Sequence, residues 1–159
     1  NCIGILISGS NEDCANAIYL NSYLPHLLVK ISNEIEAAQA TDTKAGPETL
    51  TSVKTLVHMA HRMLDLGVRN AVIIHCVERV VWVGSNRDVF IIEIEPLRAD
   101  EIASNLGAGD AFCAGLLYGI HESQGPERAI QLGNAVAQAS LKGLTATSAI
   151  SAAAIKSLR

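Results

Sequence analysis

The stretch Gly107-Ala108-Gly109-Asp110-Ala111-Phe112 leads directly into an apolar run, and this order predicts a helix that begins at an anion site. Two glycines let the backbone approach a phosphate without a Cβ in the way. The first helical turn has unpaired N–H groups and the positive end of the helix dipole, and both attract negative charge. The sequence therefore favours a phosphate site at the start of a helix over residues 109–121.

Asp110 falls in the first turn of this helix, beside the expected anion. A carboxylate repels phosphate and is therefore a poor phosphate ligand. It is well placed to take a proton from a hydroxyl that attacks the phosphate. The alternative is an ordinary loop before a helix, in which Asp110 only adds favourable charge near the helix N-terminus.

The composition disfavours several classes of function. The chain has 159 residues, of which 49% are hydrophobic, enough for one domain with its own core. The formal net charge is −4 and no cluster of Lys and Arg occurs, which disfavours nucleic-acid binding. No apolar run is long enough to span a membrane, and no basic region typical of a signal peptide precedes the first apolar run. The four widely spaced cysteines suggest buried, reduced thiols, so we expect a cytoplasmic protein.

Short apolar runs alternate with helical patterns along the chain. Strands are expected at 3–7, 27–31 and 71–75, a hairpin at 80–83 and 89–94, and helices at 11–23, 33–40, 109–121, 127–142 and 148–158, with one long helix opening at Pro47 or Glu48. The apolar strand interiors predict an α/β fold with a mostly parallel sheet covered by helices on both faces. The hairpin would add an antiparallel element at one edge. The chain starts at Asn1 with a strand-like run, which suggests a fragment of a longer protein.

The longer string over residues 105–115 resembles the second signature of the PfkB (ribokinase-like) carbohydrate kinases. The resemblance implies that Asp110 is the catalytic base. It also implies that the amides of Gly107, Ala108 and Gly109 form the anion hole for the transferred phosphoryl group.

The resemblance runs over most of the chain, in the order of the C-terminal half of those enzymes. It therefore implies one PfkB-type kinase domain portion over residues 1–159, with a ribokinase-like fold. The family's N-terminal half, which carries most substrate-binding residues and a small β-lid, has no counterpart here.

Two other matches imply cofactor-binding residues. The motif Asn33-Glu34-Ile35-Glu36 is similar to the family's Asn-x-x-Glu motif, which implies that Asn33 and Glu36 handle magnesium and phosphate, with Glu36 acting on the metal through water. The alternative is a helix start with acidic residues in its first turn. Asn134 resembles a position on the helix that passes the nucleotide base, where an amide contacts adenine or ribose; otherwise it is a polar residue on a helix of small residues.

The function implied by the resemblance is transfer of the γ-phosphoryl group of ATP to a hydroxyl of a sugar or nucleoside, with pseudouridine among the candidate acceptors. ATP and Mg²⁺ are the implied cofactors. The implied partners are a small-molecule substrate and a second copy of the chain in a homodimer, with neither nucleic acid nor membrane. The competing hypothesis is a degenerate or truncated PfkB-like fold that serves as a binding or dimerisation module.

Several residues depart from the family pattern, among them Thr145, which stands where a Gly is common. Ser104 and Leu106 occupy the places of an Asp and a Thr that help bind a monovalent cation in several members, which puts that cation site in question. Val77 and Val80 replace glycines of a loop that lies against the ATP phosphates and ribose. Branched side chains there predict weak ATP binding; the alternative is that these valines fill a gap in the core.

Overall fold

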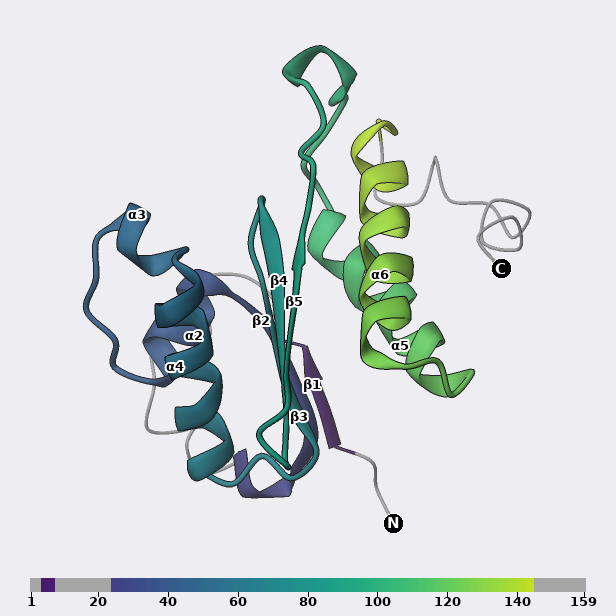
Figure 1. The fold of residues 1–159 in the computed structure, drawn as a ribbon. Coiled ribbons are helices and arrows are strands. Elements are labelled where there is room, and N and C mark those ends of the chain that lie inside the picture. The colour runs from purple at the N-terminus through teal and green to yellow at the C-terminus, as the bar shows by residue number, and fades with distance from the viewer. Residues whose placement is uncertain (1–3, 8–23, 145–159) are drawn as a thin grey trace. The chain divides into compact units, whose positions relative to one another are not determined.

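The computed structural model describes residues 4–7 and 24–144 of the chain (Figure 1). Two compact units make up the chain, Asn1–Glu93 and Ile94–Arg159. The helices expected at 11–23 and 148–158 lie outside the described residues.

The first unit contains a five-stranded sheet in the order β1-β2-β3-β4-β5. The strands are β1 (Gly4–Ile7), β2 (Leu27–Asn33), β3 (Ala71–His75), β4 (Arg79–Gly84) and β5 (Val89–Glu93). The pairs β1–β2 and β2–β3 are parallel, whereas β3–β4 and β4–β5 are antiparallel. The α/β fold class and the antiparallel edge hairpin are confirmed. The sheet is evenly mixed rather than mostly parallel, because two short turns connect β3, β4 and β5 into a meander.

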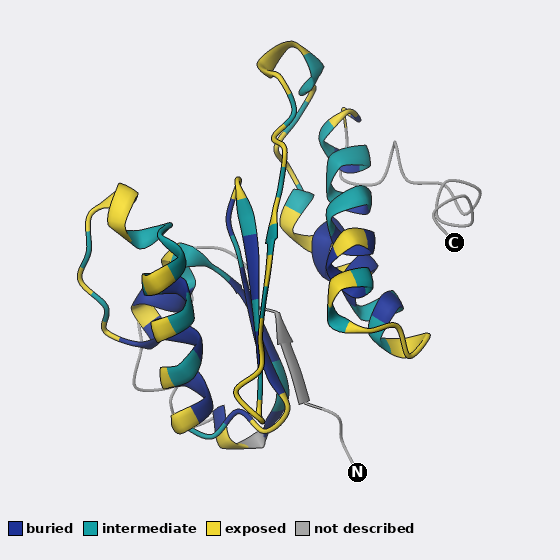
Figure 2. Ribbon diagram, viewed as in Figure 1, coloured by how far each residue is buried: buried dark blue, intermediate teal, exposed yellow. Residues whose placement is uncertain are grey.

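Three helices belong to the first unit: α2 (Glu34–Ala40), α3 (Pro47–Leu50) and α4 (Val53–Asp65), after a short 3₁₀ turn, η2 (Leu24–His26). The helix α4 packs against β3 and β4, and α2 packs against β2. Fully buried side chains of α4 and of the strands form one core (Figure 2); they include Leu56, Met59, Ala60, Met63, Val72, Ile74, Val81 and Val83. In the figures α2 and α4 lie on the same side of the sheet, while helical cover of the opposite face stays a prediction.

The single long helix expected from Pro47 is wrong, because the chain interrupts it at Thr51 and Ser52. Ser52 has extended backbone angles (φ −66°, ψ 140°), and its Oγ accepts the N–H of Thr55 at 3.3 Å. This is an N-cap, so a new helix starts there. The apolar spacing continues through both helices, which is why the pattern alone predicted one.

The second unit contains η3 (Ala99–Glu101) and a hairpin of two helices, α5 (Ala108–His121) and α6 (Pro126–Leu141). Both helices begin and end within one residue of the predicted bounds. They pack with their backbones close together: a Cβ added at Gly115 would lie 2.6 Å from the carbonyl oxygen of Leu132. A Cβ at Gly119 would lie 2.7 Å from the Cα of Ala129. The small residues of α5 therefore allow this close approach.

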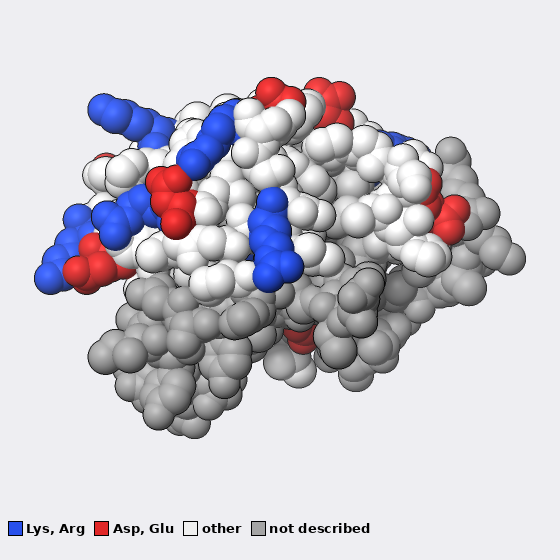
Figure 3. All heavy atoms as spheres, turned by 90° about the horizontal axis from the view of Figure 1, so that it is seen from below, with Lys and Arg blue, Asp and Glu red and all other residues white. Residues whose placement is uncertain are grey.

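Charged side chains of both signs lie among one another on the described part of the face in Figure 3. Among the described residues, ion pairs join Arg87 to Asp65 and Arg98 to Asp100. Such a face does not present a large field of one sign. No helix in the described ranges combines the length and the apolar character needed to cross a membrane.

Candidate active site

The N-terminus of α5 has the geometry expected of an anion site. Gly107 precedes the helix in a left-handed conformation (φ 79°, ψ 4°), which glycine adopts without a steric penalty. No side chain caps this helix, and the first intrahelical bond joins the N–H of Ala111 to the carbonyl of Gly107 at 2.9 Å. The N–H of Ala108 makes only a long contact of 3.5 Å, with Asn105. Within the described residues, the N–H groups of Gly109 and Asp110 have no acceptor.

Asp110 is exposed, and its carboxylate has no hydrogen bond or ion pair with any part of the chain that the structure describes. The residues that follow it, Ala111 and Phe112, are buried and fix α5 in its unit. A carboxylate held on a packed helix yet open to solvent can meet a substrate hydroxyl. The geometry thus suits a general base beside an anion.

The segment before α5 is bound to the end of α6. The N–H groups of Ala103 and Ser104 both donate to the carbonyl of Leu141, at 2.8 Å and 3.3 Å. Ser104 Oγ in turn accepts the N–H of Leu106 at 3.1 Å. These contacts fix the backbone that leads into Gly107.

Asn33 and Glu36 are brought together at the start of α2, where they form a capping box. Asn33 Oδ1 accepts the N–H of Glu36 at 2.8 Å, and Glu36 Oε2 accepts the N–H of Asn33 at 3.1 Å. The alternative reading of this motif, a helix start, is therefore present in the fold. A role with magnesium stays a prediction. In the described ranges no cluster of three or more His, Cys, Asp or Glu residues could hold a metal ion.

Asn33 lies at the carboxyl end of β2, where it pairs in register with His75 of β3. Burial lowers the pKa of His75 to about 4, so the ring is neutral at pH 7. The next residue, Cys76, is a buried free thiol whose pKa is raised, mainly by burial. Ligands of α/β sheets commonly bind at the carboxyl ends of the strands.

The two valines that replace family glycines lie in different environments. Val80 is in β4, opposite His75, and is completely buried. Val77 is in the turn between β3 and β4, and 75% of it is exposed. The core-filling alternative therefore fits Val80, and only Val77 is free to meet a ligand.

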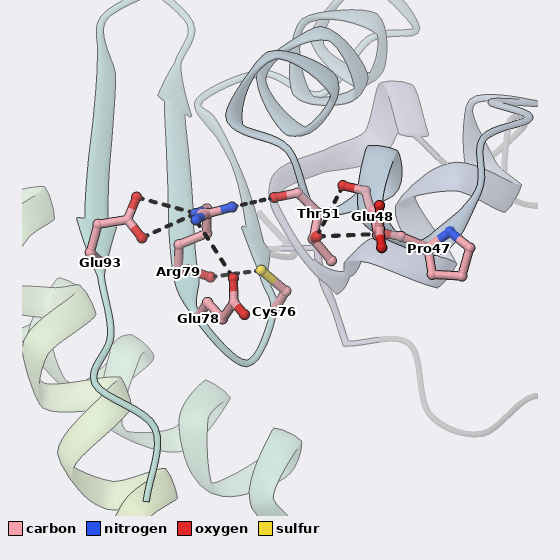
Figure 4. Close-up of polar contacts among 7 residues, drawn as sticks. All are labelled: Pro47, Glu48, Thr51, Cys76, Glu78, Arg79 and Glu93. Atoms are coloured by element: carbon pink, nitrogen blue, oxygen red, sulfur yellow. Dashed lines mark hydrogen bonds and ion pairs between the residues drawn. The ribbon is translucent and has the colours of Figure 1, made fainter.

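Sequence analysis missed a polar network around Arg79 (Figure 4). Arg79 Nη1 donates to the carbonyl of Thr51 at 2.6 Å, and Nε donates to both carboxylate oxygens of Glu93 at 3.1 Å. The carbonyl of Arg79 accepts the N–H of Cys76 at 2.9 Å and its Sγ–H at 3.4 Å. The side chain of Arg79 thus joins the α3–α4 break to the edge strand β5, and its backbone carbonyl closes the β3–β4 turn. Its partners lie 28 and 14 positions away along the chain, so no local motif announces the network.

The predicted site residues fall in two groups. Asn33 and Glu36 belong to the first unit, whereas Gly107 to Asp110 belong to the second. Asn134 also belongs to the second unit and is half-buried on α6.

The family model described as pfkB family carbohydrate kinase matches residues 7–153. The chain belongs to this family. The resemblance inferred from residues 105–115 is thereby confirmed at the level of the family, and the roles of the residues at the α5 N-terminus stay a prediction.

The chain matches only part of the length of its relatives in sequence. Over 88 residues this pfkB-family chain is 30% identical to 1-phosphofructokinase of Escherichia coli (strain K12). The matched segment covers 55% of this chain and 27% of that protein. The 1-phosphofructokinase of Haemophilus influenzae is 24% identical over 87 residues. The matched segment is thus about a quarter of these relatives.

Solved structures show the ribokinase fold for nearly the whole chain. A putative sugar kinase from Clostridium perfringens matches with a TM-score of 0.73 at 18% identity, over 97% of this chain and 46% of that one. Ribokinase from Thermotoga maritima matches with a TM-score of 0.68 at 23% identity, over 87% of this chain and 44% of that one. The pfkB-family chain therefore spans less than half the length of these proteins.

Proposed function

We propose that the protein transfers the γ-phosphoryl group of ATP to a hydroxyl of a sugar or nucleoside. The observation that carries this proposal is the exposed carboxylate of Asp110, which lies beside the unpaired N–H groups of Gly109 and Asp110 at the start of α5. Membership of the pfkB carbohydrate kinase family supports it.

Each residue of the site has a distinct task. Bound MgATP supplies the phosphoryl group. The amides at Gly107 to Asp110 stabilise negative charge on the phosphoryl oxygens while the phosphoryl group passes from ADP to the acceptor. Asp110 accepts the proton of the attacking hydroxyl. Glu36 would hold a water of the magnesium ion, since Mg²⁺ keeps several waters, and Asn134 would contact adenine or ribose.

The names of the relatives suggest three classes of acceptor. Their names include 1-phosphofructokinase, ribokinase and adenosine kinase, so sugars, sugar phosphates and nucleosides are all candidates. Pseudouridine is one nucleoside to include. A cytoplasmic homodimer is part of the same proposal.

The test is release of ADP from ATP by the purified protein with a panel of sugars, sugar phosphates, adenosine and pseudouridine. We expect release that depends on one class of acceptor and on Mg²⁺. The product should carry the phosphoryl group, which mass spectrometry detects. ADP release that is absent with every acceptor would contradict the proposal.

A second candidate is a binding or dimerisation module without catalysis. Two observations favour it: Asn33 and Glu36 already cap α2, and Val80 is a core residue where the family pattern has a glycine. It predicts that ATP or an acceptor shifts the melting temperature while no product forms.

A further inference from the structure

The edge strand β5 has backbone groups that no neighbouring strand uses. In the part of the chain that the structure describes, β5 is the last strand of the sheet and pairs with β4 alone. At the hairpin the N–H of Gly84 donates to the carbonyl of Asp88 at 3.0 Å. Hydrogen-bonded and non-hydrogen-bonded pairs alternate along an antiparallel ladder, so the N–H and C=O groups of Val89, Ile91 and Glu93 point away from β4. Among the described residues nothing bonds to these groups.

The same strand is apolar and lacks the residues that usually protect an edge. Val89 and Ile91 lie opposite Val83 and Val81, which are buried in the core with α4. On β5 this apolar face is open, because Val89 is 39% exposed and Ile91 is 40% exposed. The strand contains neither Lys nor Pro, and its one charged residue, Glu93, stands at its end. Such an edge is suited to pair with a further strand.

The sequence of β5 complements itself when two copies run antiparallel. With Phe90 opposite Phe90 of the second copy, Val89 faces Ile91, and the outward backbone groups of these two residues meet. The same register brings Arg87, just before the strand, to Glu93 of the second copy; the two side chains are 49% and 62% exposed. Aromatic, apolar and opposite-charge pairs across strands are each stabilising. The next register, with Ile91 opposite its own copy, would place Glu93 against Val89.

We infer that β5 is the interface of a homodimer in which two copies pair antiparallel through this strand and form one continuous sheet. Val89 and Ile91 bury apolar surface there, while Arg87 and Glu93 set the register. The inference rests on the homodimer that the proposed function includes, and it is independent of catalysis. Absence of kinase activity would leave it intact, and absence of the dimer would leave the catalytic proposal intact.

The first test measures the mass of the purified protein by sedimentation velocity over a range of concentrations. We expect the wild type to dimerise as its concentration rises. Ile91→Lys places an ammonium group on the pairing edge and should weaken the dimer at least about tenfold. The matched control is Ile35→Lys, at an isoleucine of α2 that is 49% exposed, and it should dimerise as the wild type does. A wild type that is monomeric at every concentration, or an Ile91→Lys variant that dimerises equally well, would overturn the inference.

The second test determines the register and does not depend on the folding of Ile91→Lys. In Phe90→Cys the two thiols stand in a non-hydrogen-bonded pair with Cα atoms about 4.5 Å apart, within the range of a disulfide. In Ile91→Cys they stand diagonally, roughly 7–8 Å apart, which is too far. With copper phenanthroline as catalyst and dissolved oxygen as oxidant, Phe90→Cys should form a covalent dimer at least about tenfold faster than Ile91→Cys or the wild type. Equal rates in the three proteins would overturn this pairing of β5.

Discussion

Asp110 and Glu127 are both acids in the first turn of a helix, but only Asp110 follows a glycine in the left-handed conformation. Asp110→Asn keeps the shape of the side chain and removes the base. We expect turnover to fall at least about a hundredfold, because no other group in the proposed site takes the proton. Steady-state kinetics on Asp110→Asn and on the control Glu127→Gln measure this.

Melting temperatures of both variants should stay close to that of the wild type, since each acid is exposed. Glu127→Gln should also keep its turnover. If Asp110→Asn remained as active as the wild type, the proton would have to go elsewhere and Asp110 would not be the base.

Val77 and Val80 separate the two explanations for the valines in the β3–β4 region. Val80 is fully buried, so Val80→Gly removes a packed side chain from a strand and should cost about 2–4 kcal/mol of stability. Val77 is exposed, so Val77→Gly should change stability by less than about 0.5 kcal/mol. Denaturant unfolding measures both costs.

ATP titration of the same variants tests the expectation of weak nucleotide binding. Val77→Gly should tighten ATP binding if the turn lies against the nucleotide, because a glycine backbone can approach the phosphates more closely. Unchanged affinity for ATP in Val77→Gly would show that this turn is not a nucleotide contact. The prediction that both valines lie in one loop against the nucleotide is not supported, because Val80 is buried in the core.

At the scale of elements, the close packing of α5 on α6 depends on Gly115. An added Cβ would lie 2.6 Å from the carbonyl oxygen of Leu132 and 2.9 Å from the Cα of Gly133, so the helices must move apart. We expect Gly115→Ala to destabilise the second unit by about 1–3 kcal/mol. Gly46→Ala, whose added Cβ meets nothing within 4 Å, is the control and should change stability by less than about 0.5 kcal/mol.

Far-UV circular dichroism during thermal unfolding measures the stability of both variants. Because α5 carries the proposed anion site, Gly115→Ala should also lower turnover below its melting temperature. Equal stability of Gly115→Ala and the wild type would mean that the helices adjust without cost, contrary to the distances.

Most elements could be predicted because local sequence determines them. The helix α5 follows from its two glycines and its apolar run, and the capping box at Asn33 and Glu36 follows from a four-residue motif. The break between α3 and α4 could not be predicted, since the apolar spacing continues across it. What holds the break is Arg79, which reaches the carbonyl of Thr51 from another element.

At the scale of the whole molecule, alternating strands and helices predicted the α/β fold, and family membership agrees with it. The even mixture of parallel and antiparallel pairs was not predicted, because the short turn between β3 and β4 has no strong turn signal. The partial burial of His75 was not predicted either. Burial depends on which elements cover a residue, and the apolar run along β3 does not contain that information.

The pH dependence of stability tests this burial. The pKa of His75 is about 4 in the fold and near 6.5 in an unfolded chain. The unfolded state therefore binds an extra proton as pH falls below 6.5, so this contribution to stability is complete above pH 6.5 and is lost on the way to pH 4. The loss should reach up to about 3 kcal/mol. Asp65, whose pKa is lowered mainly by its hydrogen bond to Arg87, adds stability that is complete above its ordinary pKa of 3.8 and is lost only below that pH.

Urea unfolding followed by the fluorescence of Trp82, the sole tryptophan and a residue of β4, measures the stability of the first unit at each pH. The wild type and the control His58→Gln, an exposed residue of α4, should lose stability in parallel between pH 6.5 and 4. His75→Gln cannot take up the proton, so its stability should change much less over the same range. If His75→Gln followed the wild-type curve, another group would titrate there and His75 would be accessible to protons in the folded state.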